Sequence, residues 1–144
     1  MSLSKKFLVW AAALAALVGA FYAASIAAQP AADTGRSSVV PPAYFRGSVG
    51  NDVLVGTNGD DVLMGLGGND RIDGRGGSDL VSGGNGNDRL TGGSGRDTLN
   101  GGRGADRLYA RDGRRDIVNG GPGFDEAWVD RNDVVTNVER VHRS

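Results

Sequence analysis

The sequence predicts an all-β fold, a parallel β-roll (β-solenoid) that forms one domain. Three observations predict it: a period of nine residues, glycine at two fixed positions of every period, and an aliphatic residue at a third. Among the 144 residues there are 25 Gly, but only two Trp, three Tyr and four Phe. A core built from large side chains is therefore not expected.

Seven blocks of nine residues follow one another without a gap from 47 to 109. Positions 1 and 4 are always Gly, position 6 is always Asp, and position 8 is Leu, Ile or Val. The glycines indicate backbone that takes a positive φ or packs closely against another segment, as in a tight turn. The last three residues place one apolar side chain between two mostly polar ones. That alternation predicts a short strand with its middle residue facing inward.

A six-residue turn and a three-residue strand reverse the chain, so two blocks complete one coil. Successive coils then stack as parallel strands about 4.8 Å apart. This stacking places each Asp of position 6 one strand spacing from the Asp two blocks further along the chain. Carboxylates about 5 Å apart repel by roughly 1 kcal/mol in water and about 3 kcal/mol at an effective dielectric constant of 20. A cation between them would remove this repulsion.

The ligands available for such a cation are oxygen atoms, because the chain has no Cys and a single His. Hard carboxylate and carbonyl oxygens suit Ca²⁺, whereas zinc and copper favour His or Cys and Mg²⁺ demands rigid octahedral geometry. We therefore expect Ca²⁺ sites at the Asp residues of position 6, which are Asp52, Asp61, Asp70, Asp79, Asp88, Asp97 and Asp106.

These blocks resemble the nonapeptide GGxGxDxUx of the RTX (repeats-in-toxin, hemolysin-type) calcium-binding repeat family, over about 47–128. The resemblance implies a β-roll in which Ca²⁺ binds to Asp side chains and backbone carbonyls of two stacked turns. It implies five in-register sites, between Asp52 and Asp70, Asp61 and Asp79, Asp70 and Asp88, Asp79 and Asp97, and Asp88 and Asp106. The glycines that it implies as ligands are Gly65, Gly74, Gly83, Gly84, Gly92, Gly93, Gly101 and Gly102.

Position 2 departs from the family pattern in the first four blocks, where it is Ser48, Thr57, Leu66 and Arg75. If this position needs a left-handed backbone, the N-terminal turns are strained and their sites are weaker.

The register breaks after the seventh block, where the segment ARDGRRDIVN is one residue longer than a block. In that segment we expect Asp116 and Ile117 to take the ligand and core roles. The block 120–128 restores the pattern with Asp125, although Ala127 is a small core residue. Because the inserted residue lengthens the last Asp-to-Asp spacings by one, sites at these two Asp residues are left open.

The N-terminal segment 1–28 is expected to be a signal peptide, because two lysines precede an apolar run and small residues suit cleavage after Ala27. An uncleaved membrane anchor is the alternative, since Phe7 to Ala28 is long enough to span a bilayer. We expect 29–46 to be a flexible linker, in which Tyr44 and Phe45 could cover the open end of the roll. The roll is expected over 47–128.

The C-terminal segment 129–144 is expected to cap the other open end, with Trp128 as a lid over it. The valines of this segment would supply the apolar contacts. A frayed terminus is one alternative, and a C-terminal secretion signal, which would conflict with the N-terminal leader, is the other.

Composition narrows the functional classes. The sole His is His142, and no catalytic set can be assembled around it, so the protein is not expected to be an enzyme. A formal net charge of −1 gives no case for nucleic-acid binding. The arginines of position 7 (Arg71, Arg89 and Arg107) are expected to form a solvated face, with a polyanion-binding stripe as the alternative.

We expect a secreted, monomeric calcium-binding protein that serves as a structural or adhesive surface module. Its partners would be calcium ions and a cell-surface polysaccharide or secreted protein, and it would contact the membrane only if the leader is uncleaved. The alternative is a non-catalytic accessory module of a secreted enzyme or toxin. Because the small core cannot outweigh the cost of ordering so many glycines, folding is expected to depend on calcium.

Overall fold

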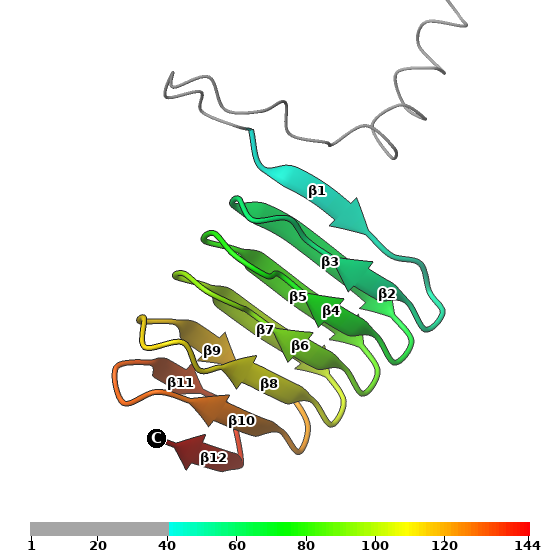
Figure 1. The fold of residues 1–144 in the computed structure, drawn as a ribbon. Helices are drawn as coiled ribbons and strands as arrows, with labels where there is room; N and C mark the ends of the chain where they lie inside the picture. The colour runs from blue at the N-terminus through cyan, green and yellow to red at the C-terminus, as the bar shows by residue number, and fades with distance from the viewer. Residues whose placement is uncertain (1–40) are drawn as a thin grey trace, which may run out of the picture. The chain divides into compact units, whose positions relative to one another are not determined.

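The computed structural model describes residues 41–144, which form a parallel β-roll (Figure 1). The expected signal peptide and most of the expected linker lie outside the described residues. Twelve strands alternate between two six-stranded sheets. Sheet A contains β1 (Ala43–Arg46), β3 (Asp61–Gly67), β5 (Leu80–Asn85), β7 (Thr98–Arg103), β9 (Ile117–Asn119) and β11 (Val134–Thr136). Sheet B contains β2 (Val53–Val55), β4 (Arg71–Asp73), β6 (Arg89–Thr91), β8 (Arg107–Ala110), β10 (Glu126–Val129) and β12 (Arg140–Arg143).

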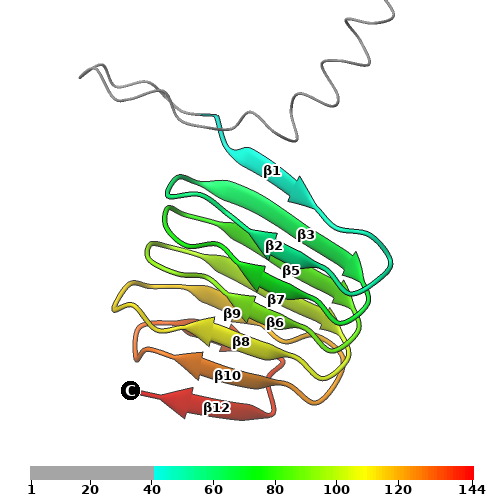
Figure 2. The same ribbon diagram turned by 45° about the vertical axis from the view of Figure 1, so that its right-hand side comes forward.

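Each strand pairs in parallel with the strand one coil further along the chain. Leu63 stands opposite Val81, and Val81 stands opposite Leu99, so the predicted coil of two blocks is confirmed. Figure 2 shows the same stack from a second direction, with the turns aligned along the edges of the roll. Within residues 41–144 there is no helix long and apolar enough to cross a membrane.

The core is a double row of aliphatic side chains, one from each half-coil. Position 8 is fully buried in blocks 2 to 7 and partly buried at Leu54 in block 1. The fully buried members are Leu63, Ile72, Val81, Leu90, Leu99 and Leu108. Ala110, Val118, Ala127 and Val129 continue the row toward the C-terminus. Most strands thus contribute one inward aliphatic side chain, whereas β8 and β10 contribute two each.

The expected core role of Ile117 is wrong. Its side chain is 52% exposed on the outer face of β9, and Val118 is fully buried in its place. The extra residue of the longer segment is absorbed in the loop before Asp116. The strand therefore keeps its phase relative to the Asp, with the core residue two positions after it.

The N-terminal end of the roll begins earlier than the sequence suggests. Residues 43–46, expected in the linker, form β1 and pair with β3. Phe45 stands opposite Leu63 and packs against the core, as its expected covering role requires. Tyr44 points outward and is 75% exposed, because neighbouring residues of a strand face opposite sides.

The C-terminal segment continues both sheets beyond residue 128. β11 pairs with β9 and β12 pairs with β10, so these strands occupy the end of the roll. The expected lid role of Trp128 is wrong, because Ala127 and Val129 point inward and Trp128 therefore lies on the outer face of sheet B. There its ring stacks between Tyr109, at 4.6 Å between centroids, and His142, at 5.0 Å.

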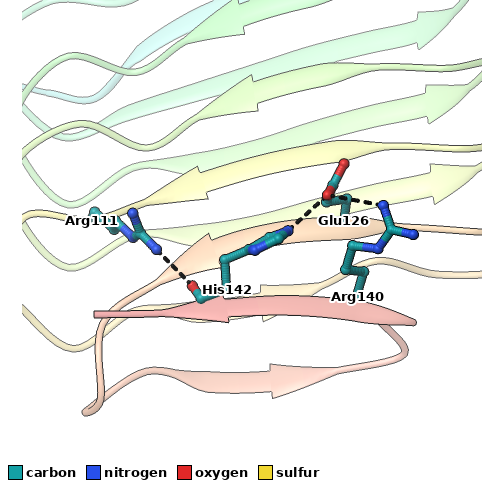
Figure 3. A network of polar contacts seen from close by, with 4 residues as sticks. All are labelled: Arg111, Glu126, Arg140 and His142. Atoms are coloured by element: carbon teal, nitrogen blue, oxygen red, sulfur yellow. Dashed lines mark hydrogen bonds and ion pairs between the residues drawn. The ribbon is translucent and has the colours of Figure 1, made fainter.

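Polar contacts fasten β12 to the preceding coil (Figure 3). His142 Nε2 lies 2.7 Å from Glu126 Oε1, and the Arg140 guanidinium lies 3.6 Å from the same oxygen. Arg111 Nη2 donates a hydrogen bond of 3.1 Å to the carbonyl of His142. The last strand is thus held by side chains as well as by its ladder.

Candidate metal sites

The Asp residues of position 6 form two columns, one beside each sheet, and each Asp lies at or directly before the start of a strand. From Asp61 onward they are almost completely buried, with at most 3% of the residue exposed. One oxygen of each carboxylate from Asp70 onward is satisfied by the protein. Oδ1 accepts a hydrogen bond of 2.7–2.9 Å from the backbone N–H of the Asp one coil earlier. The columns therefore tie successive coils together.

The second oxygen of these carboxylates has no partner in the described protein. Seven Oδ2 atoms are buried and accept no hydrogen bond: those of Asp70, Asp79, Asp88, Asp97, Asp106, Asp116 and Asp125. Burying a charged oxygen without a partner costs free energy, and here the same cost recurs in seven turns. A cation bound beside each of these oxygens would offset it.

Backbone carbonyls converge on the same oxygens. A Cβ added to Gly65 would collide with both Asp70 Oδ2 and the carbonyl oxygen of Gly83. The same arrangement recurs at Gly74, with Asp79 Oδ2 and the Gly92 carbonyl. Position 1 must therefore be glycine, because a side chain would fill the space that the two oxygens share. The carbonyls of Gly65, Gly74, Gly83, Gly92 and Gly101 all face an Asp Oδ2 of the preceding coil in this way.

Two of the expected position-2 carbonyls lie elsewhere. Those of Gly84 and Gly102 face the backbone of the position-2 glycine in the following coil, at Gly102 and Gly121. Residues 41–144 contain no group of three or more acidic, His or Cys side chains that could hold a metal. A cation in these turns would therefore draw its ligands from carboxylate oxygens and main-chain carbonyls, a hard donor set that fits Ca²⁺.

Burial changes the acidity of the columns. It raises the pKa of Asp79 from 3.8 to about 7, and those of Asp106 and Asp116 to about 6, with neighbouring carboxylates adding to the shift. The pKa values of Asp88, Asp97 and Asp125 are raised mainly by burial as well. In each case the backbone hydrogen bond to Oδ1 opposes the shift. The columns thus resist carrying negative charge until something compensates it.

The first two turns are built differently. Asp52 Oδ2 accepts hydrogen bonds from the backbone N–H of Ser48, at 2.6 Å, and from its hydroxyl, at 3.0 Å. Thr57 donates to Asp61 through the same two groups. Both hydroxyls also accept the N–H of the glycine two residues later. In both turns the amide of position 2 donates to the Oδ2 that has no partner in the later turns. The Ser48 hydroxyl donates to this same oxygen, whereas the Thr57 hydroxyl donates to Asp61 Oδ1.

From the third block onward, position 2 has the left-handed backbone on which the expected strain depends. Leu66 and Arg75 have φ of 81° and 75°, and Gly84 has φ of 113°. Ser48 and Thr57 are not among the residues with positive φ. The strain expected for all four N-terminal turns is therefore confined to two of them, because the first two adopt another turn.

The turns after the longer segment repeat the geometry of the central ones. Asp97 donates its N–H to Asp116 Oδ1, and Asp106 donates to Asp125 Oδ1, both at 2.8 Å. The next carboxylate of each column was not predicted from the sequence. Asp133 Oδ1 accepts the N–H of Asp116, and Glu139 Oε2 accepts that of Asp125. The sequences Asp-x-Val and Glu-x-Val at these residues repeat the acidic and aliphatic positions of a block and could have indicated them. Their distance from the preceding Asp residues, however, no longer fits the nine-residue period.

The family model of the RTX calcium-binding nonapeptide repeat matches the chain in four copies, over residues 46–81 and 82–115. No curated protein and no solved structure matches the chain. The matched residues include all seven regular blocks, and the resemblance of those blocks to this family is confirmed.

Proposed function

Residues 46–115 belong to the RTX calcium-binding nonapeptide repeat family, and from this premise we propose that the protein is a secreted module that folds when it binds several Ca²⁺ ions. Outside the cell it would serve as a structural or adhesive surface element. The observation that carries the proposal is the set of seven buried Asp Oδ2 atoms without a partner, distributed over the two columns. Ca²⁺ would supply the positive charge that each of these oxygens lacks.

We assign the ions to the five in-register Asp pairs between Asp52 and Asp106. Each would be held by the carboxylates of its pair and by the position-1 carbonyl that faces the first Asp of that pair. The pairs that begin at Asp52 and Asp61 would bind more weakly, because Ser48 and Thr57 already donate to those carboxylates. The turns at Asp116 and Asp125 share the central geometry and are proposed as additional sites.

Export from the cell would explain why folding depends on calcium. The lysines and apolar run of segment 1–28 support secretion. A chain that needs Ca²⁺ to fold would stay unfolded where the ion is scarce and would fold once outside, where it is abundant. The roll would then act as a rigid spacer or contact surface.

Circular dichroism of the purified protein in EDTA and then in excess CaCl₂ tests the proposal. We expect a disordered spectrum in EDTA and a cooperative gain of β structure with Ca²⁺, and isothermal titration would give the number of ions. A structured spectrum that EDTA leaves unchanged would contradict it.

A pair of matched variants tests the assignment of the sites. Asp88→Asn removes a buried carboxylate of the central column and is expected to lower both the stoichiometry and the affinity. Asp60→Asn is the control, because Asp60 is exposed and its Oδ1, which an amide oxygen can replace, accepts the N–H of Ser78. Equal losses in the two variants would argue that charge alone, rather than the column, binds the ion.

A further inference from the structure

Three arginines stand in register on the outer face of sheet B. Arg71 pairs with Arg89, and Arg89 pairs with Arg107, on the adjacent strands β4, β6 and β8. All three side chains are exposed. Like charges directly opposite each other weaken a sheet, so this arginine column opposes the fold that displays it.

Sheet A shows that the fold does not require the charges. Position 7 of its strands occupies the equivalent place in the same repeat and is filled by Val62, Leu80, Thr98 and Ile117. The same coil therefore forms with uncharged residues at this position. The arginines of position 7 lie only on sheet B, and the nine-residue repeat alone does not explain this difference between the two sheets.

The column is not neutralised within the described protein. In residues 41–144 no carboxylate lies within 4.0 Å of any of its three guanidinium groups. The next position in the row is Glu126, which already contacts His142 and Arg140 (Figure 3). Arg89 lies 4.4 Å from the centroid of the Tyr109 ring, a contact that leaves its charge in place.

Hydrogen-bonding groups and a hollow lie beside the column. Position 9 of the same strands supplies Thr91 and Tyr109, which lie on the same face as the second and third arginines. Together with Gly93, Arg111 and Trp128 they line an open cavity of about 420 Å³. The face thus combines a straight row of cations with hydroxyl groups and a recess at its edge.

We propose that the arginine column and this recess bind an acidic polysaccharide that lies along the axis of the roll. Guanidinium groups form paired hydrogen bonds with carboxylate or sulfate, and the neighbouring hydroxyls suit those of sugars. The inference rests on the proposed function, because residues two blocks apart align into a column only when the roll is folded. Calcium would thereby control the binding of the polymer.

A single-stranded nucleic acid fits this face less well. Such ligands bind by stacking their bases on exposed aromatic faces. Here the ring of Tyr109 is covered by Arg89 and Trp128, and that of Trp128 is covered by Tyr109 and His142. The aromatic faces are therefore already occupied by one another.

The test uses the full protein in excess CaCl₂ with three polymers: hyaluronan, which carries carboxylates, dextran sulfate, and neutral dextran. The variant R71Q/R89Q/R107Q removes the column. The matched control R96Q/R114Q/R115Q removes the same charge from exposed arginines that line a separate cavity near the C-terminal turns. Circular dichroism and calcium titration establish that each protein is folded and loaded before binding is measured.

We expect the wild type to bind one or both acidic polymers and not dextran, with affinity that falls as salt rises. The column variant should bind at least about tenfold more weakly, whereas the control should change little. Hyaluronan and dextran sulfate distinguish carboxylate from sulfate as the recognised group.

Several results would overturn the inference. Equal losses in both variants would indicate attraction by net charge, and a loss confined to the control would move the site to the C-terminal cavity. Tighter binding of single-stranded DNA than of either acidic polysaccharide would refute the chosen partner. A folded, calcium-loaded wild type that binds neither acidic polymer would refute polysaccharide binding by the arginine column but leave the proposed function intact. A protein that takes up no Ca²⁺ would refute the proposed function as well.

Discussion

Single residues at position 2 decide which of two turns a block adopts. Ser48 and Thr57 form a turn in which the hydroxyl and amide reach the carboxylate of the same block. Leu66 and Arg75 instead take the left-handed backbone that glycine takes in later blocks. A side chain in this conformation costs about 1–2 kcal/mol. In these two turns the Asp Oδ2 therefore has no partner, and the backbone at position 2 is strained.

Arg75→Gly should stabilise the calcium-loaded roll. Relief of the left-handed strain exceeds the added entropy of a glycine in the unfolded chain, so the expected gain is about 1 kcal/mol in the free energy of unfolding. Thermal unfolding in excess CaCl₂ measures it. Arg75→Ala is the control, because it removes the same charge but keeps the Cβ. An equal gain in both variants would show that charge, and not φ, is responsible.

The buried carboxylates predict opposite responses to pH with and without calcium. Because the folded-state pKa of Asp79 is raised to about 7, and those of Asp106 and Asp116 to about 6, protonation favours the calcium-free roll. Their stabilising contribution is complete below the ordinary pKa of 3.8 and is lost as the pH rises through about 6 to 7.

In EDTA we therefore expect β structure to increase as the pH falls from about 7.5 to about 4.5, when it is followed by circular dichroism. In the same range the apparent affinity for Ca²⁺ should fall, because protons compete for the same oxygens. Loss of β structure in EDTA on acidification would contradict the first expectation.

At the level of elements, the sequence predicts strands better than the loops that join them. The nine-residue period places β2 to β8, because glycine, Asp and the aliphatic residue recur at fixed spacing. It fails at Ile117, because the core residue still follows its Asp by two positions and the prediction did not keep that spacing across the longer segment. The roles of Trp128 and Asp133 also escaped prediction, because both depend on how β12 and the last loop return to the roll.

The last strand should depend on its side-chain contacts. His142→Ala removes both the stacking on Trp128 and the contact with Glu126, so amide exchange in β12 should become faster than in the wild type. Hydrogen–deuterium exchange of residues 140–143 measures this. His142→Phe keeps a ring on Trp128 and should recover part of the protection. Unchanged exchange in the alanine variant would show that the backbone ladder alone holds β12.

At the scale of the whole molecule, each strand pairs only with the strands of the neighbouring coils, and all coils share one double row of core residues. The architecture and most members of this core could be predicted from composition and period. The arrangement of the ligands could be predicted only in outline. The spacing indicates which Asp residues stack, whereas the use of Oδ1 by a backbone N–H, which leaves Oδ2 for a cation, is visible only in the structure.

A defect in the central core should be transmitted to calcium binding. Leu90 is fully buried, and Leu90→Ala is expected to cost about 3 kcal/mol. If five ions bind as the roll folds, the midpoint of the calcium titration should rise about threefold, because the loss is divided among them. Titration followed by circular dichroism measures the midpoint. Val141→Ala is the control, since Val141 is 39% exposed at the end of the roll and should shift it little.

The hydroxyl-bearing turns at the N-terminal end have a kinetic consequence. Because Ser48 and Thr57 donate to the carboxylates of their own turns, the first coil needs a bound ion less than the later coils do. Once ordered, it would offer two unpaired strand edges, those of β1 and β2, on which the second coil could pair and bind its ions, and the third would follow. Assembly of the roll would consequently have a direction, from β1 and β2 toward the C-terminal strands.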